Sequence, residues 1–165
     1  MDKKTTYIRQ LFSSDEKEVM AALSHITEKG YPEIATDLIK LYSETPSSLV
    51  KETTIYILNN LKNKNSVIHF VKGLIQVQNK DARIDLISAC WQNGLNYSDH
   101  LDYFIDIIAT ESIHHAIEAF TVIECNFSQL NNKQMNKFKK HLIKVRKSKK
   151  IKNSKLFAEI EKMIE

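Results

Sequence analysis

The sequence predicts an all-α protein, an α-solenoid of about four antiparallel helix pairs with a short capping helix at each end. The main observation is that matching apolar positions recur 31 to 34 residues apart. In the first helix of each pair these positions are Leu23, Thr54, Ile87 and Phe120, followed one turn later by Ile26, Ile57, Cys90 and Ile123. In the second helix they are Leu38, Val71, Phe104 and Phe138, followed by Tyr42, Ile75, Ile108 and Leu142. Such a period indicates units that bury their apolar faces against one another.

Composition supports the same fold class. Only three Gly and two Pro occur in 165 residues, so the chain has little turn material for sandwiches, barrels or phosphate-binding loops. Apolar residues make up 42% and charged residues 27%, which is the balance of a folded protein rather than a disordered one. The length suits one domain over 1–165.

The N-terminal half shows clear start and stop signals. A capping helix is expected over Lys4 to Phe12, because its apolar residues can cover the first repeat. In that repeat, 15–44, Ser14 is expected to cap the first helix, Gly30 to end it and Pro32 to open the second helix. The repeat at 47–78 is predicted to be helical from its periodicity, although Thr53 and Thr54 are mildly unfavourable in helices.

The C-terminal half is read in the same way. In the repeat at 80–110, Gly94 is expected to end the first helix and Ser98 to cap the second. The repeat at 111–147 follows, and apolar residues at helical spacing predict a C-terminal capping helix over 154–164.

Two segments carry a resemblance to a known family. Leu86-Ile87-Ser88-Ala89-Cys90-Trp91-Gln92-Asn93-Gly94-Leu95 and Glu118-Ala119-Phe120-Thr121-Val122-Ile123-Glu124 resemble stretches of small bacterial HEAT-like α-helical repeat proteins. The resemblance implies an armadillo-type solenoid with short repeats. Some HEAT-like proteins are DNA glycosylases that act on alkylated bases, which leaves that activity as a remote alternative. No catalytic residue can be carried over to this chain.

The sequence contains no recognisable catalytic motif, so we expect a protein that is not an enzyme. The chain lacks G-x-S-x-G, P-loop, G-x-G-x-x-G and H-E-x-x-H motifs. Its histidines do not have the spacing of zinc ligands, and its acidic pairs have no Gly-rich loop to position them. We therefore expect no cofactor and no metal site.

The first functional hypothesis is a scaffold or adaptor that binds another protein. In solenoids the second helices often line a concave surface, and aromatic residues beside charges are good binding hot spots. The residues expected there are Lys40, His69, Phe70, Asp102, Tyr103 and Asp106. The alternative for Phe70 and Tyr103 is that both rings pack between neighbouring repeats.

The second hypothesis is nucleic-acid binding by the basic segment 133–155. Residues 1–130 have a net charge of −5 and residues 131–165 one of +9. The candidate phosphate contacts are Lys137, Lys139, Lys140, Lys144, Arg146 and Lys147. Two alternatives remain: a solvated surface, and a contact between this segment and the acidic residues of the third repeat, in the same chain or in another copy.

The sequence gives no sign of a membrane protein. Charged or amide side chains interrupt every apolar stretch before it reaches the 18 residues that a spanning helix needs. The segment Met1 to Phe12 has basic residues but no apolar region behind them, unlike a secretory signal. We expect a cytoplasmic protein.

Overall fold

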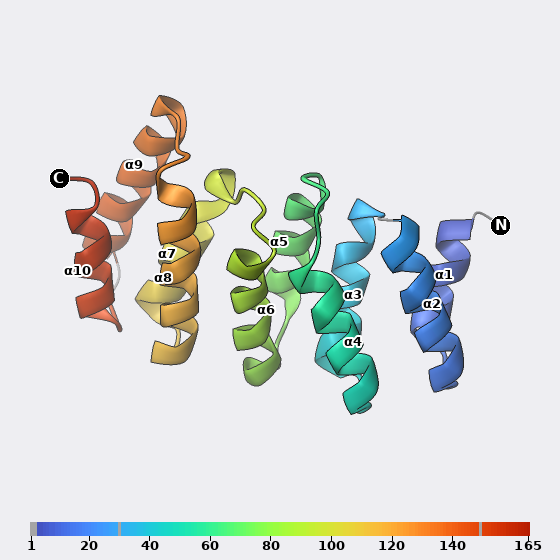
Figure 1. Ribbon diagram of the computed structural model, residues 1–165. Coiled ribbons are helices and arrows are strands. Elements are labelled where there is room, and N and C mark those ends of the chain that lie inside the picture. The colour runs from blue at the N-terminus through green and yellow to red at the C-terminus, as the bar shows by residue number, and fades with distance from the viewer. Residues whose placement is uncertain (1–2, 30, 149) are drawn as a thin grey trace. The chain divides into compact units, whose positions relative to one another are not determined.

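The computed structural model describes residues 3–29, 31–148 and 150–165, and in these residues the protein is all-α (Figure 1). The described residues form ten α-helices and two short 3₁₀ helices, with no strand, so the prediction of an all-α protein is confirmed. The chain divides into two compact units, Met1–Leu95 (unit 1) and Asn96–Glu165 (unit 2). The division falls inside the predicted repeat 80–110, and the single domain and its repeat boundaries stay predictions.

Unit 1 consists of two rows of helices. The elements are α1 (Lys3–Leu11), α2 (Glu16–Lys29), the 3₁₀ helix η1 (Pro32–Ile34), α3 (Ala35–Glu44), α4 (Ser48–Asn59), α5 (Ser66–Gln76) and α6 (Lys80–Gln92). In one row α2 packs against α4 and α4 against α6, and in the other α1 packs against α3 and α3 against α5 (Figure 1). Contacts between α1 and α2, between α3 and α4, and between α5 and α6 join the two rows.

The matching apolar positions that recur along the sequence, here called ladders, explain why these helices pack as they do. In the first helices Leu23, Ile57 and Ile87 are buried, as predicted. Thr54 is fully buried at the matching position, and its hydroxyl donates 2.6 Å to the carbonyl of Val50 one turn earlier. The helix thus satisfies the threonine by itself, and the predicted helix forms despite it.

Two of the predicted inward positions are not buried: Phe120 in unit 2 is half-buried, and Ile75 on α5 is exposed. Ile75 was expected inside, one turn after Val71, but it is 55% exposed. Leu74 is fully buried instead, so the apolar face of α5 continues at i+3 rather than i+4. The neighbouring Gly73 lies against α3, where an added Cβ would stand 3.0 Å from Ile39 Cδ1 and 3.2 Å from Thr36 Cα.

Helix ends agree with the predictions in part. The Ser47 hydroxyl accepts a 3.2 Å hydrogen bond from the Val50 N–H and caps α4. Pro32 opens a 3₁₀ turn, and the α-helix begins at Ala35. Gly94 follows α6 with φ +68°, a left-handed conformation that suits glycine. The expected stop at Gly30 lies outside the described residues.

Unit 2 is centred on α7. Its elements are the 3₁₀ helix η2 (Ser98–His100), α7 (Leu101–Thr110), α8 (Ile113–Phe127), α9 (Asn132–Ser148) and α10 (Ser154–Lys162). α7 packs against α8, α9 and α10, and α10 also packs against α8. The predicted cap by Ser98 is wrong: Ser98 lies in the 3₁₀ turn, and its buried Oγ has no hydrogen-bond partner in the described structure.

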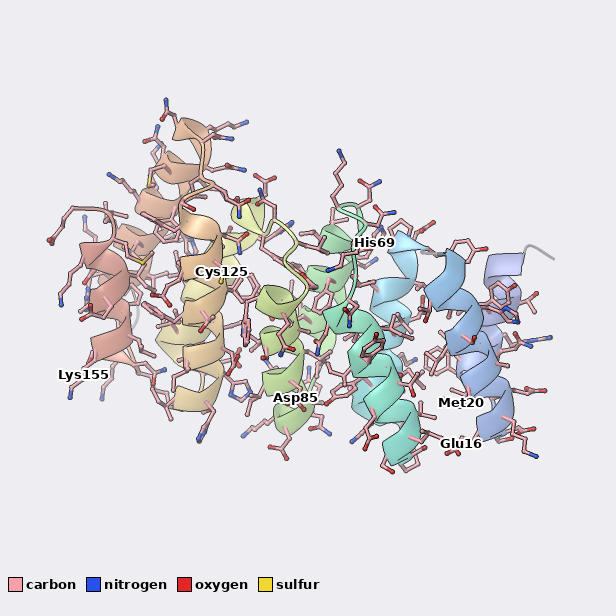
Figure 2. The ribbon with its side chains drawn as sticks, viewed as in Figure 1. Glu16, Met20, His69, Asp85, Cys125 and Lys155 are labelled. Atoms are coloured by element: carbon pink, nitrogen blue, oxygen red, sulfur yellow. The ribbon has the colours of Figure 1, made fainter. Side chains whose placement is uncertain are left out.

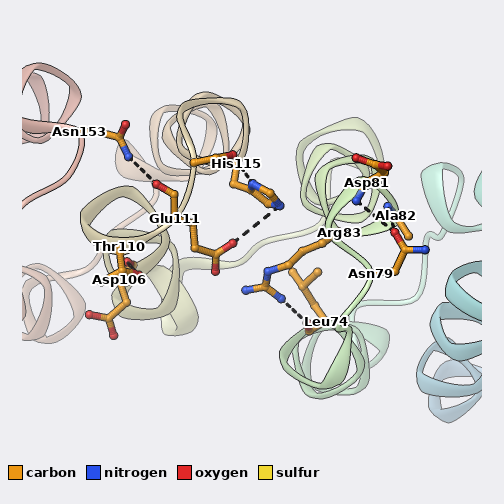
Figure 3. Close-up of polar contacts among 11 residues, drawn as sticks. Leu74, Asn79, Asp81, Ala82, Arg83, Asp106, Thr110, Glu111, His115 and Asn153 are labelled. Atoms are coloured by element: carbon orange, nitrogen blue, oxygen red, sulfur yellow. Dashed lines mark hydrogen bonds and ion pairs between the residues drawn. The ribbon is translucent and has the colours of Figure 1, made fainter.

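The link before α10 closes the end of α7. Asn153 Nδ2 donates 3.1 Å to the Glu111 carbonyl (Figure 3) and 2.8 Å to the Ile108 carbonyl. The Lys152 N–H donates 2.8 Å to the Ala109 carbonyl. The last carbonyls of a helix have no partner within the helix, so these bonds satisfy them and hold α10 in place. None of the helices in the described residues is long and apolar enough to span a bilayer.

Candidate functional site

The basic helix α9 has two different faces. Phe138, Leu142 and Val145 are buried and anchor the helix in unit 2. The opposite face consists of five lysines at intervals of three or four residues, which we call the lysine face: Lys133, Lys137, Lys140, Lys144 and Lys147. All five are exposed, and nitrogen-tipped side chains project from α9 in Figure 2. At 1.5 Å per residue the row is about 21 Å long.

The lysine face borders a shallow depression of about 750 Å³. It is lined by Lys133, Asn136, Lys137, Lys140, His141 and Lys144. Cations therefore dominate its rim, and an anion is the ligand that such a surface favours.

One lysine of this row is engaged within unit 2. Lys137 Nζ lies 3.0 Å from Asp102 Oδ2 and 3.0 Å from the Asp99 carbonyl oxygen. This is the contact between basic and acidic residues of one chain that the sequence left as an alternative. Within the described residues, the other four lysines of the face have no carboxylate at ion-pair distance.

Arg146 is engaged in a contact within unit 2. Its guanidinium forms a bidentate pair with Glu161 of α10, with Nε 2.8 Å from Oε1, and lies 4.8 Å from the centre of the Phe157 ring. The hydrogen bond to Glu161 raises the pKa of Arg146. Lys139, the remaining predicted phosphate contact, is half-buried. These two residues lie beside the lysine face and not on it.

The predicted protein-contact residues of α7 face their own chain. Asp102 pairs with Lys137, and Asp106 Oδ1 lies 3.4 Å from His141 Nε2. Tyr103 is half-buried, with its ring in an edge contact 5.6 Å from that of Phe104. Burial lowers the pKa of nearby His100 against the opposing charges of Asp102 and Asp99. α7 thus supplies the acidic wall against which α9 packs.

The predicted contact residues of unit 1 differ in exposure. Lys40 is exposed, with its ammonium 5.2 Å from the centre of the Phe12 ring, and it lines a groove of about 240 Å³ between α3 and α5. His69 is half-buried on α5 (Figure 2), and its carbonyl accepts 2.9 Å from the Thr36 hydroxyl. Phe70 is fully buried, so its predicted place on the exposed face is wrong and its ring packs in the core.

One polar arrangement was missed by the sequence analysis. Ser112 Oγ lies 2.6 Å from His115 Nδ1, and His115 Nε2 lies 3.9 Å from Glu111 Oε2 (Figure 3). Serine, histidine and a carboxylate are the groups of many nucleophilic sites. Here His115 is only 4% exposed, and Ser112 is the N-cap residue of α8 but makes no side-chain hydrogen bond to the backbone of that helix, so the three side chains form a local, mostly buried contact. A serine three residues before a histidine was the available signal.

Two further observations limit the chemistry of the described residues. They contain no group of three or more His, Cys, Asp or Glu side chains that could hold a metal ion. Cys90 is buried in α6, where its thiol lies 3.5 Å from the Leu86 carbonyl oxygen, and Cys125 is exposed on α8 (Figure 2). Comparison of the chain with known protein families and with curated proteins finds no match.

Proposed function

We propose that this protein is a non-catalytic binding module, built as a HEAT-like α-solenoid, whose lysine face binds nucleic acid. The observation that carries the proposal is the row of exposed lysines on α9. Four of them, Lys133, Lys140, Lys144 and Lys147, have no carboxylate partner in the described residues. A row of unpaired cations on a rigid helix can replace the counterions of successive phosphates.

Helix energetics support the same reading. Like charges three or four residues apart destabilise a helix by about 0.2 to 0.5 kcal/mol per pair. Lys140 stands between Lys137 and Lys144 at these spacings, and Lys147 follows Lys144 at the same spacing. The buried face with Phe138 and the pairing of Lys137 with Asp102 offset part of this repulsion, and a bound polyanion would relieve it.

The α-solenoid and the HEAT-like class belong to this proposal too. The support is the packing in unit 1, where each of the helices α1 to α4 contacts the helix two places further along the chain, which is its neighbour in the same row. Matching positions such as Leu23 and Ile87, or Leu38 and Val71, are buried in equivalent places. A stack of this kind presents a broad and rigid surface without a catalytic cleft.

Protein binding through the second helices is the second candidate function. It is favoured by the groove between α3 and α5, where Lys40 and Glu44 place opposite charges beside Gly73. An affinity capture with wild type, Lys40→Glu and the matched surface variant Lys51→Glu would test it. A partner retained equally by all three proteins would place the interface elsewhere.

The nucleic-acid proposal is tested by anisotropy titrations with labelled random duplex DNA at several salt concentrations. Four phosphate contacts predict a slope of log K against log salt of about −3.6, which corresponds to about 100-fold weaker binding at 200 mM than at 50 mM salt. In the triple variant Lys140→Gln, Lys144→Gln, Lys147→Gln, the slope should fall in magnitude by about 2.7.

The matched control is the triple variant Lys17→Gln, Lys51→Gln, Lys72→Gln, which removes the same charge from unit 1. Its slope should equal that of the wild type. If the wild type does not bind at 50 mM salt, or if both triple variants lose affinity equally, the lysine face is not the binding site. Random single-stranded RNA in the same assay shows which polymer is preferred.

A further inference from the structure

A second cavity lies in unit 1, lined by residues of α2 and α4, by the segment before α3 and by residues 61–63. Its volume is about 480 Å³. Pockets that bind small molecules in proteins have volumes of roughly 300 to 1,000 Å³. The cavity therefore has the size of a small-molecule site, and it is separate from the lysine face of α9.

Its walls are mainly apolar and aromatic. Ile26 and Ile57 face it from the two helices, and Tyr31 and Ile34 line it from the segment before α3. Tyr56 also lines it, although 65% of this residue is exposed. An exposed aromatic ring at the edge of an apolar cavity is hydrated unfavourably and offers a contact surface for an apolar ligand. These walls suit a flat apolar body.

The polar side of the cavity contains an unsatisfied donor. Ser66 lines the cavity and is fully buried, yet its Oγ has no hydrogen-bond partner in the described structure. A buried hydroxyl without a partner costs about 1 to 3 kcal/mol. A ligand atom that accepts a hydrogen bond from Ser66 would recover this loss.

Two features make that acceptor an anion. Ser66 is the first residue of α5, an eleven-residue helix whose dipole favours negative charge at this end, although the Ser66 and Val67 N–H groups themselves donate to the Asn63 and Lys64 carbonyls. Lys62 also lines the cavity and is exposed, and no carboxylate of the described residues lies at ion-pair distance from it. A buried hydroxyl at the start of a helix and an exposed lysine thus line the same mainly apolar cavity.

We infer that this cavity binds a small amphipathic anion with a flat apolar body and a single carboxylate or sulfonate-like head. The head group accepts a hydrogen bond from Ser66 and lies near the ammonium of Lys62. The apolar body lies between the rings of Tyr31 and Tyr56 and the side chain of Ile57.

The test uses two fluorescent probes with similar rings: anilinonaphthalene sulfonate, which is an anion, and N-phenylnaphthylamine, which is neutral. The wild type should bind the anionic probe at one saturable site, at least tenfold more tightly than the neutral probe. Lys62→Gln and Ser66→Ala should each weaken the anionic probe at least fivefold and leave the neutral probe unchanged. Tyr56→Ala should weaken both probes.

Lys72→Gln is the matched control, because this lysine is exposed on α5 and does not line the cavity. It should bind both probes as the wild type does. Equal affinity for the two probes in the wild type, or the same anionic-probe affinity in Lys62→Gln and Lys72→Gln, would overturn the inference. Amide shifts of the wild type give an independent measurement: the largest probe-induced changes should lie at Ile57, Lys62 and Ser66, and changes confined elsewhere would also overturn it.

Discussion

The phenol hydroxyl of Tyr42 on α3 donates a 2.6 Å hydrogen bond to Asp85 Oδ2 on α6, 43 residues further along the chain. Tyr42 is only 7% exposed, whereas Asp85 reaches the surface of unit 1 (Figure 2). The bond joins the two rows of helices at a point where the chain itself does not connect them. Burial, together with the hydrogen bond and charge of Asp85, raises the pKa of Tyr42 well above its ordinary value.

Tyr42→Phe should therefore destabilise the protein at neutral pH. Hydrogen bonds to charged groups contribute about 1.5 to 3 kcal/mol, and the exposed acceptor here favours the lower end of that range. We expect the free energy of unfolding to fall by about 1.5 kcal/mol, measured by urea unfolding with circular dichroism. The control is Tyr56→Phe, whose exposed ring should change stability by less than about 0.5 kcal/mol.

The same bond predicts a difference between the two proteins at alkaline pH. Because the folded-state pKa of Tyr42 is raised, its contribution is complete below the unfolded pKa of about 10 and is lost as the pH rises above it. The stability advantage of the wild type over Tyr42→Phe should shrink by about 0.8 kcal/mol at pH 10.5. Unfolding curves that stay equally separated from pH 8 to pH 10.5 would contradict this assignment.

Periodicity predicted the helices and most of the core, but not the bonds between them. Tyr42 was expected inside from its ladder position, whereas its partner Asp85 stands 43 residues away, a separation that matches no period of the sequence. Ser98 was wrong for a similar reason, because a cap depends on the local backbone, and the helix there begins with a 3₁₀ turn. Ladder spacing reports which face is buried, and it does not report side-chain geometry.

The close approach of α3 and α5 at Gly73 gives a prediction about packing. Alanine at this position would place a Cβ 3.0 Å from Ile39 Cδ1 and 3.2 Å from Thr36 Cα, which forces the two helices apart. Overpacking costs about 1 to 3 kcal/mol, and the better helix propensity of alanine returns about 1 kcal/mol. Gly73→Ala should therefore lower the free energy of unfolding by up to about 2 kcal/mol.

Gly94 separates this packing effect from a backbone effect. A Cβ at Gly94 meets nothing within 4 Å, but its φ of +68° is strained for alanine. Gly94→Ala should cost about 1 to 2 kcal/mol, and Gly94→Asn should cost less because asparagine tolerates the left-handed region. Gly73→Asn, in contrast, should be worse than Gly73→Ala, since its side chain is larger. The opposite order at either position would contradict the assigned cause, as measured by thermal and urea unfolding.

The side chain of Asn126 forms a hydrogen bond with the backbone at the start of unit 2. Its Oδ1 accepts a 2.8 Å bond from the buried Tyr97 N–H, and its Nδ2 donates 2.8 Å to the Val122 carbonyl. Asn126→Ala leaves the Tyr97 N–H without an acceptor, which should cost about 2 to 3 kcal/mol. Asn60→Ala is the matched control, because Asn60 Nδ2 makes the same type of bond, to the Tyr56 carbonyl, on the surface. Its cost should stay below about 0.5 kcal/mol, and equal effects in urea unfolding would show that Tyr97 does not depend on Asn126.

The candidate sites were predictable to different extents. The basic character of α9 can be read from composition, and helical spacing places Lys140, Lys144 and Lys147 on one face. That Arg146 pairs with Glu161 instead depends on the packing of α10, which the sequence does not specify. The predicted place of Phe70 on the exposed face was wrong, because Phe70 stands three residues after Val67 and four before Leu74, both of which are buried on the same face of α5. The cavity at Ser66 carries no sequence motif.

Lys140→Glu should stabilise the fold and weaken nucleic-acid binding at the same time. Lys140 has lysines three residues before it and four residues after it, so glutamate replaces two repulsions by two attractions and precedes Lys144 in the favourable order. We expect a gain of about 0.8 to 2 kcal/mol in unfolding free energy, which high salt removes. The slope of log K against log salt for DNA should fall in magnitude by about 1. Lys72→Glu makes the same charge change where no lysine stands at these spacings, and it should alter neither quantity. A loss of stability in Lys140→Glu would mean that the lysines of α9 do not repel one another as proposed. An equal loss of DNA affinity in both variants would mean that they do not bind phosphates as proposed.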